Sequence, residues 1–209
     1  MLIKQRHAES YSSLRLAKDC LLYYYHQYRL KDLKFVPSPV LQRGKKIHSE
    51  LERAVKNKKP PLDVWTPSGL MEKLWDLNAE AEVGLAVSRK LEPVDFWDAR
   101  ALCRGRADVK YIEDGQLCYV DWKTGQLRVD KYQAEVTHFV SVPGGPPIKF
   151  TWVFVDQEEV KEEIITSKSD IQVVKDLIWI EEEDDFEPTR CWRCKFCPVP
   201  PKDCPIKEY

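Results

Sequence analysis

Two aspartates and a lysine occupy matched positions on a predicted β-hairpin. The dipeptide Asp114-Gly115 separates two β-rich runs and is typical of a two-residue turn. Counting outward from this turn places Asp108 directly opposite Asp121, with Cβ atoms about 5 Å apart. Because like charges so close together destabilise a sheet, the pair predicts a divalent cation bound between the two carboxylates. Lys123 is expected one pleat further along the same face.

The opposite face of the hairpin supports this register because it is apolar. Three residues of the first strand are expected to meet three of the second: Ala107, Val109 and Tyr111 against Trp122, Val120 and Cys118. A shift of one residue would turn the aspartates into the core. Arg106 shares the charged face with the aspartates. The alternative is that an exposed edge hairpin carries these charges only for solubility.

The elements around the hairpin predict an α/β fold with a central mixed β-sheet flanked by helices. Helical patterns cover residues 10–30, 41–57, 67–77, 129–142 and 167–183, and strand patterns cover 79–83, 150–155 and 160–166. The first helix is expected to include Cys20, and Ser167 with Asp170 resembles the capping box of the last helix. A chain of 209 residues is long enough for one sizeable core, so we expect a single domain over 1–209.

The overall charge argues neither for nor against nucleic acid as a partner. The chain has 33 Lys and Arg against 34 Asp and Glu, a formal net charge of −1. The distribution is more informative, because basic residues concentrate in 43–59 and 100–131. The acidic run 181–185 is interpreted as a solvated helix end. No apolar stretch is long enough to span a membrane, and residues 1–10 lack a signal-peptide core, so we expect a soluble, cytoplasmic protein.

A cluster of cysteines near the end of the chain indicates a metal site. Four of the seven cysteines fall there: Cys191, Cys194, Cys197 and Cys204. In a reducing compartment such spacing favours metal ligation over disulfides. Zinc would accept all four thiolates, whereas an iron–sulfur cluster would accept three of them together with a distant one such as Cys20. The alternative is a tail of free surface thiols, and Cys103 and Cys118 are interpreted as structural.

Several motifs together resemble the PD-(D/E)XK nuclease superfamily, in particular its RecB-like branch. They are a Ser-Tyr-Ser-Ser-Leu-Arg helix start, Gly44-Lys-Lys-Ile-His48, Gly105-Arg-Ala-Asp108, Val120-Asp121-Trp-Lys123 and Gln133 in the following helix. One early cysteine with Cys194-x2-Cys197-x6-Cys204 is similar to the 4Fe–4S subset, which includes CRISPR-associated exonucleases and AddB-type helicase–nucleases. The order and spacing of these motifs, rather than any one of them, make the resemblance specific.

The resemblance implies hydrolysis of DNA phosphodiesters with Mg²⁺ or Mn²⁺ in a restriction-endonuclease-like core. His48, Asp108, Asp121 and the Trp122 carbonyl would hold the metal, and Lys123 would orient the attacking water. A histidine among oxygen ligands shifts the preference toward Mn²⁺. The implied domain has three parts: a helical part over 1–60 that carries Cys20 and His48, a catalytic sheet core over 79–166 and a cluster-binding tail over 188–209.

Further roles follow from the same resemblance. Gln133 would contact DNA or orient the site; the tyrosine usual four residues later is Thr137 here, and the adjacent Tyr132 is a substitute. Arg106 and Tyr132 are candidate DNA contacts. Glu80 and Glu82 are interpreted as surface carboxylates, and the alternative is that one of them approaches the site from its strand. The favoured cluster ligands are Cys20, Cys194, Cys197 and Cys204, and the alternative is a tail-only zinc site that includes Cys191.

The expected activity is that of an exonuclease acting on DNA ends or single strands in recombination or repair. Because the sequence carries no P-loop, unwinding of duplex would need a partner such as a helicase, and a recombinase or a single-strand-binding protein are further candidate partners. The alternative function is a non-catalytic DNA-binding or scaffold module stapled by a four-cysteine metal site. Asp108, Asp121 and Lys123 argue against it, because a scaffold gains nothing from facing carboxylates.

Overall fold

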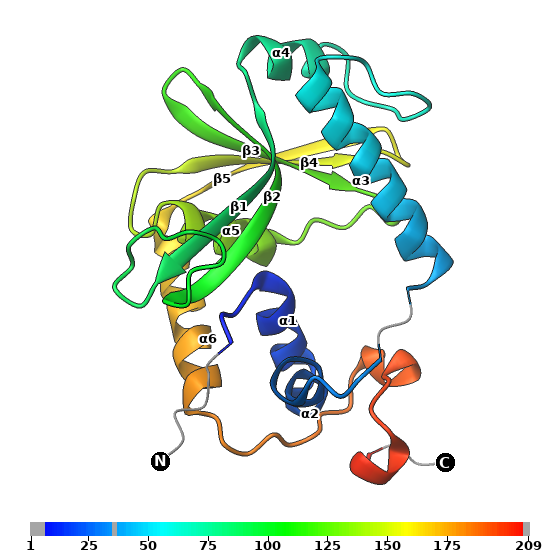
Figure 1. The fold of residues 1–209 in the computed structure, drawn as a ribbon, viewed down its shortest axis with the longest axis vertical. Helices are drawn as coiled ribbons and strands as arrows, with labels where there is room; N and C mark the ends of the chain where they lie inside the picture. Colours follow the sequence, from blue (N-terminus) through cyan, green and yellow to red (C-terminus); the bar gives the residue numbers. More distant parts are fainter. Residues whose placement is uncertain (1–6, 35–36, 207–209) are drawn as a thin grey trace. The chain divides into compact units, whose positions relative to one another are not determined.

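The computed structural model describes residues 7–34 and 37–206 (Figure 1). The chain divides into two compact units, one of residues 37–170 and one formed by the described residues of 1–36 and 171–209. The expectation was a single domain over 1–209. The division after residue 36 falls inside the predicted N-terminal part and assigns Cys20 and His48 to different units. Each unit is therefore described by itself.

The unit of residues 37–170 is built on a mixed five-stranded sheet, as predicted. Its strands are β1 (Glu80–Ser88), β2 (Ala101–Glu113), β3 (Gln116–Lys123), β4 (Ile148–Phe154) and β5 (Glu159–Ile165). They lie side by side in sequence order, and neighbours are antiparallel except for the parallel pair β3–β4. Helix α5 (Lys131–Ser141) provides the crossover that a parallel pair requires. This is an α/β fold.

The β2–β3 hairpin closes through the predicted two-residue turn. Asp114 and Gly115 both have positive φ angles, 49° and 77°, as the favoured hairpin turns require. Glu113 pairs with Gln116, and the ladder continues in the predicted register to Val109–Val120. The turn chemistry therefore sets the register of the strands that carry the site.

Helices cover both faces of the sheet (Figure 1). Helices α3 (Pro39–Asn57) and α4 (Leu70–Asp76) pack on one face, and their buried residues share a core with the strands: Leu51, Val55, Met71, Leu74, Val109, Val120, Trp122 and Val153. Helix α5 lies on the other face, where Ala134 joins Tyr119, Ile148, Phe150, Trp152, Phe154 and Ile165. The Ser38 side chain accepts from the Leu41 amide, so α3 begins two residues before the predicted start.

One part of the predicted hairpin face is wrong. Val109 and Tyr111 share the α3-side core with Trp122, but Ala107 belongs to the α5-side core. The alternation of faces changes at Asp108, opposite the point where Glu82 of β1 has a φ of 56°. The β1–β2 ladder contains partners for Ala81 and Val83, on either side of this residue. The irregularity displaces the charged residues from a uniform pleat.

The other unit consists of short helices and turns. They are α1 (Tyr11–Asp19), α2 (Leu21–Tyr24), the π-helix η1 (Tyr25–Leu30), α6 (Asp170–Glu182), and the 3₁₀ turns η3 (Trp192–Phe196) and η4 (Pro201–Asp203); a further turn, η2 (Ser167–Ser169), precedes α6. Reciprocal bonds between Ser10 and Ser13 cap α1, as the serines predict. No helix within residues 7–34 and 37–206 is long and apolar enough to cross a membrane.

Two predictions about these helices need correction. The first helix is not continuous to residue 30, because Cys20 has an extended backbone (φ −165°, ψ 112°) and separates α1 from α2. The predicted capping box at the start of the last helix is replaced by η2. Asp170 instead bonds to His138 Nδ1 at 2.8 Å and accepts from the Gly144 amide at 2.8 Å. Tertiary partners therefore outweigh the local capping preference.

Candidate metal and cysteine sites

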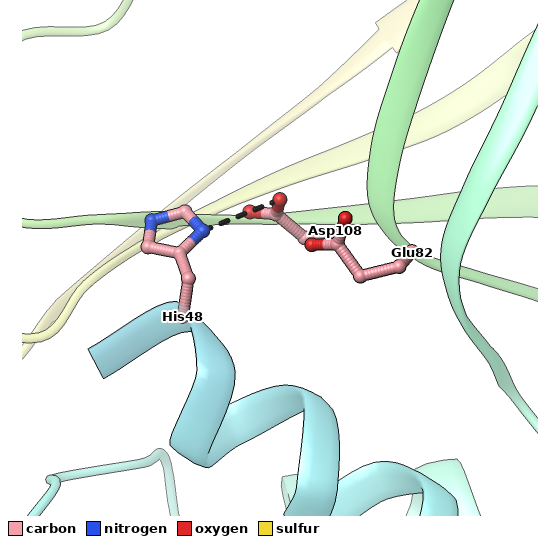
Figure 2. Close-up of side chains that lie close together, drawn as sticks. All are labelled: His48, Glu82 and Asp108. Atoms are coloured by element: carbon pink, nitrogen blue, oxygen red, sulfur yellow. Dashed lines mark ion pairs between the residues drawn. The ribbon is translucent and has the colours of Figure 1, made fainter. Parts of the chain in front are cut away.

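Three side chains from three elements converge at the edge of the α3-side core. His48 comes from α3, Glu82 from β1 and Asp108 from β2, and one ligand atom of each lies within 4.8 Å of the others (Figure 2). His48 Nδ1 is 3.4 Å from Asp108 Oδ1. An imidazole with two carboxylates is a donor set that suits Mn²⁺ and other divalent cations. The residues present thus fit the ion that the sequence implies.

Asp108 and Asp121 do not form the predicted cross-strand pair. Among the described residues the β2–β3 ladder ends at Val109–Val120, one position short of the two aspartates. Beyond this point Asp108 Oδ2 accepts a 2.8 Å hydrogen bond from the Trp122 amide. The carboxylate thus takes the place of a backbone acceptor and is held against β3. The group of Trp122 that contacts Asp108 is its amide, and the role of its carbonyl as a metal ligand stays a prediction.

Asp121, Lys123 and Gln133 form a second cluster beside the first. Lys123 Nζ lies 2.8 Å from Asp121 Oδ2 and donates to Gln133 Oε1 at 2.6 Å. Gln133 Nε2 in turn donates to Asp121 Oδ1 at 2.6 Å. The three side chains close a ring of contacts between β3 and α5, so each fixes the orientation of the other two. The structure brings these predicted residues together.

The pKa of Asp121 is raised to about 6. Burial is the largest cause, and the charge of Asp108 adds to it, while Lys123 and Gln133 favour the ionised form. Asp121 and Asp108 are therefore electrostatically coupled although they are not strand partners. A positive charge placed near both carboxylates would relieve this repulsion.

In the His48–Glu82–Asp108 cluster, the pKa values of Glu82 and His48 are also shifted. Burial raises the pKa of Glu82, and the negative charge of Asp108 raises it further, against a smaller opposing effect of Arg106. Burial would lower the pKa of His48, but the hydrogen bond to Asp108 and the nearby carboxylates outweigh it, so the net shift is upward. A partly buried group of carboxylates with one imidazole is an environment suited to a cation.

Glu82 is the residue that sequence reasoning underestimated. The favoured interpretation was a surface carboxylate, and approach to the site was the alternative. In the structure Glu82 has a positive φ and lies with His48 and Asp108. Glu80 does behave as a surface residue and pairs with Lys110 at 3.2 Å. Arg106, a predicted DNA contact, lies 3.5 Å from Glu82. The other predicted contact, Tyr132, is partly exposed on α5 next to Gln133.

The cysteines of the other unit gather around one small pocket. Five thiols line it: Cys20, Cys191, Cys194, Cys197 and Cys204. The Cys191 amide donates to Cys194 Sγ at 3.3 Å. Burial raises the pKa of the Cys191 thiol, and the nearby Cys194 and Cys20 add to the shift. The pocket contains both predicted ligand sets, and soft thiolates are the donors that zinc and iron–sulfur clusters use.

The extended backbone at Cys20, between α1 and α2, positions the Cys20 thiol in the pocket. Cys20 is buried and extended, its amide still donates to Leu16, and its carbonyl accepts from Tyr24. Helical hydrogen bonding therefore continues on both sides of one non-helical residue. Arg193 Nε donates to Asp19 Oδ2 at 2.6 Å and ties the cysteine segment to the end of α1. Cys103 and Cys118 lie in β2 and β3 and are buried, as the structural interpretation expects.

Comparisons with known proteins bear on the fold. No family model matches the chain, and no curated protein matches it significantly. Among the solved structures that match is the crystal structure of SSO0001, which aligns over 99% of this chain and 90% of that chain. The TM-score is 0.56 and the sequence identity is 18%. This likeness supports the α/β architecture, a mixed five-stranded sheet with flanking helices.

Proposed function

We propose that this protein is a divalent-metal-dependent deoxyribonuclease, and that it acts as an exonuclease on DNA ends or single strands. The observation that carries the proposal is the juxtaposition of two clusters, His48–Glu82–Asp108 and Asp121–Lys123–Gln133. The first offers ligands for a hard cation, and the second offers a fixed cation beside a buried carboxylate. In phosphodiester hydrolysis a metal can polarise the phosphate, and a positioned ammonium group can counter the negative charge that develops on it.

The proposed metal ligands are Glu82 and His48 together with the two aspartates. Mg²⁺ or Mn²⁺ bound there would polarise the scissile phosphate and lower the pKa of a bound water. Asp108 is held in position by the Trp122 amide, and His48 by its contact with Asp108. Relative to the sequence-based ligand set, Glu82 is added, and the Trp122 carbonyl stays a predicted further ligand.

Lys123 is the proposed catalytic cation. Its ammonium group lies between Asp121 and Gln133, which keep it at the end of β3. From this position it orients the attacking water and counters the negative charge that develops on the phosphate. Gln133 is a positioning residue, because it contacts both of the groups that act on the substrate.

The test measures cleavage of linear single- and double-stranded DNA with Mn²⁺ or Mg²⁺. Asp121→Ala and Lys123→Ala are each expected to reduce the rate by about 10²- to 10⁴-fold. Lys149→Ala is the matched control, because Lys149 is also a strand lysine in an ion pair, with Glu162 at 3.0 Å. Equal residual activity in all four proteins would overturn the mechanism and favour the non-catalytic DNA-binding module.

For the cysteine pocket we propose a 4Fe–4S cluster held by Cys20, Cys194, Cys197 and Cys204. The cluster would supply a covalent link between distant segments of the chain, and its role would be structural. Anaerobic purification followed by a visible spectrum and an iron assay tests this assignment. A colourless, folded protein that contains zinc would overturn it in favour of a zinc site.

A further inference from the structure

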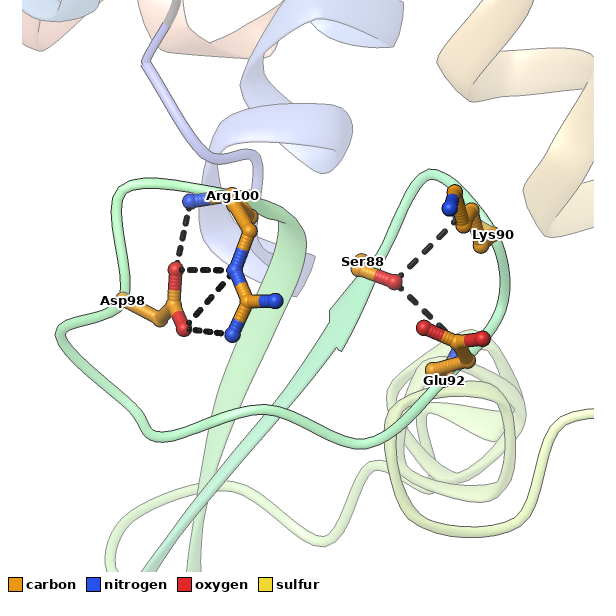
Figure 3. Close-up of polar contacts among 5 residues, drawn as sticks. All are labelled: Ser88, Lys90, Glu92, Asp98 and Arg100. Carbon is orange, nitrogen blue, oxygen red and sulfur yellow. Dashed lines mark hydrogen bonds and ion pairs between the residues drawn. The ribbon is translucent and has the colours of Figure 1, made fainter.

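The loop between β1 and β2 is held in shape at both ends. Near its start, Ser88 Oγ accepts from the amides of Lys90 and Glu92, each at 3.3 Å (Figure 3). Near its end, the Asp98 carboxylate accepts from the Arg100 amide at 2.7 Å and from its guanidinium at 2.6 Å. These charge-assisted bonds lower the pKa of Asp98 to about 2. The loop is therefore a preformed structure.

This loop presents two aromatic rings. Phe96 lies directly on Gly84 of β1, where a Cβ atom would come within 3.0 Å of its ring. Trp97 stands edge-on to Phe96, with ring centroids 4.8 Å apart, and is 77% exposed. A large exposed aromatic ring that rests on a partly buried neighbour is suited to stacking against a flat ligand. The missing side chain of Gly84 makes room for this arrangement.

Two arginines of β2 lie against the same rings. The guanidinium of Arg104 is 5.5 Å from the centroid of Phe96 and 5.4 Å from that of Trp97, and that of Arg106 is 5.3 Å from Phe96. Within the described part of the chain no carboxylate pairs with Arg104, and its buried Nε makes no hydrogen bond. Arg100 differs, because Asp98 neutralises it. Arg104 thus offers an uncompensated positive charge beside an exposed tryptophan.

The arginines and the proposed metal ligands lie on one face of the sheet. Gly105 faces Val140 of α5, so Arg104 and Arg106 on either side of it lie on the opposite, α3 face. Asp108 reaches this same side, because it contacts His48 of α3. On β1 the facing residues are Ala86 and Gly84, followed by Glu82. A nucleotide strand laid along this face would meet the metal ligands first, then Arg106, and then Arg104 with Trp97.

We propose that Trp97, Phe96, Arg104 and Arg106 form a nucleotide-binding subsite for the single strand that flanks the cleaved bond. This inference rests on the proposed nuclease function and adds the residues that position the substrate. Trp97 stacks on a base, while Arg104 and Arg106 contact the phosphates next to it. Because the loop is rigid, the subsite fixes how far the stacked base lies from the metal ligands.

The first test measures binding without catalysis. A fluorescent single-stranded oligodeoxynucleotide is titrated in EDTA and followed by anisotropy. Trp97→Ala is expected to weaken binding about 5- to 100-fold, and Trp97→Phe much less, because an aromatic ring still stacks. Trp192→Ala is the matched control, since Trp192 is 58% exposed and also carries an arginine, Arg193, over its ring.

The proposed phosphate contact of Arg104 is tested through the salt dependence of oligonucleotide binding. Arg104→Gln is expected to reduce the slope of log K against log salt by about 0.7, the value for one phosphate contact on a single strand. Arg53→Gln is the control, because Arg53 is exposed but paired with Glu50 at 2.8 Å. An unchanged slope for Arg104→Gln would remove Arg104 from the subsite.

An abasic scan locates the stacked base. Removing one base at a time, without removing its phosphate, is expected to weaken wild-type binding at a defined position, and Trp97→Ala should be insensitive at that position. Equal affinity of Trp97→Ala and wild type, with cleavage of DNA by wild type intact, would overturn the subsite alone. Weakened binding by Trp97→Ala in a protein that never cleaves DNA would overturn the nuclease proposal and leave a DNA-binding subsite.

Discussion

The two candidate metal sites are built in opposite ways. The His48–Glu82–Asp108 group and its Asp121–Lys123–Gln133 neighbour lie on regular helices and strands that are backed by two buried cores. The cysteine pocket is lined by an extended residue between two short helices and by residues in or next to 3₁₀ turns. The first site rests on elements that have packed cores of their own, whereas the second consists of segments that have little regular structure.

This difference assigns different tasks to a bound metal. Where the scaffold already fixes the ligands, an ion adds chemistry and little stability. Where short segments converge on thiols, the binding energy of the metal becomes folding energy. We therefore expect substitutions in the charged site to reduce activity and substitutions in the cysteine pocket to reduce order. The following measurements test this contrast.

The largest expected effect is on activity. Asp108→Asn should reduce the rate of DNA cleavage by about 10²- to 10⁴-fold, because a proposed metal ligand loses its charge. The unfolding free energy should change little, since the asparagine carbonyl can still accept from the Trp122 amide. Cleavage kinetics and urea denaturation measure the two quantities. An Asp108→Asn variant that is fully active, or one that unfolds, would contradict the expectation that substitutions in the charged site reduce activity and not stability.

The scaffold of the charged site is tested by opening a cavity in its core. Leu51 of α3 is completely buried, three residues after His48, so Leu51→Ala should lower the unfolding free energy by about 2–5 kcal/mol. Leu62→Ala is the control, because Leu62 is 75% exposed and its change should stay within about 0.5 kcal/mol. Similar losses of unfolding free energy in both variants would show that the α3-side core does not stabilise the scaffold of the charged site.

The cysteine pocket is tested by removing one thiol. Cys194→Ala should abolish metal binding and make residues 188–206 at least about 10-fold more sensitive to protease, because local order depends on the ligand. Cys118→Ala removes a buried thiol from β3 and should leave the metal content unchanged. The same comparison of Cys20→Ala with Cys191→Ala identifies the fourth ligand, and retention of the metal by Cys20→Ala would overturn the favoured set.

The smallest effect concerns a buried carboxyl in the unit of the cysteine pocket. Burial raises the pKa of Glu9 above its usual value of 4.5, although Tyr24 and Arg29 favour ionisation. The folded state therefore holds this proton more tightly than the unfolded state, so stability is complete below pH 4.5 and falls as the pH rises through the raised pKa. Glu9→Gln should remove this decline, worth about 1.4 kcal/mol per unit of pKa shift. Urea denaturation from pH 4 to 8 measures it.

Local chemistry made much of the charged site predictable. The Asp114-Gly115 turn set the hairpin register, and a continuous β-rich run identified β4, with the following run as its partner β5. The end of the ladder beyond Val109 was not predictable, because it depends on a side chain that replaces a backbone acceptor. The approach of Glu82 to the site was only the less favoured alternative for a similar reason, since no sequence signal marks a positive φ at a glutamate.

In the cysteine pocket the ligand residues were predictable from the sequence, but the backbone that carries one of them was not. The thiols were easy to recognise, and five of them do meet, but the helix that carries Cys20 was expected to be continuous. Residues 10–30 have the periodicity of one helix, but the extended Cys20 interrupts it and lines the pocket. Periodicity reports the buried face of a segment and not an interruption of its backbone.

The cysteine pocket draws its thiols from both ends of the described chain, and this has a consequence for biosynthesis. Cys20 leaves the ribosome 171 residues before Cys191, since 191 − 20 = 171. At typical elongation rates that interval is roughly 10 to 35 s. The sheet of residues 80–165 is translated entirely within it. The proposed metal can therefore bind only after the sheet has been translated, and until then Cys20 must stay reduced and unmodified.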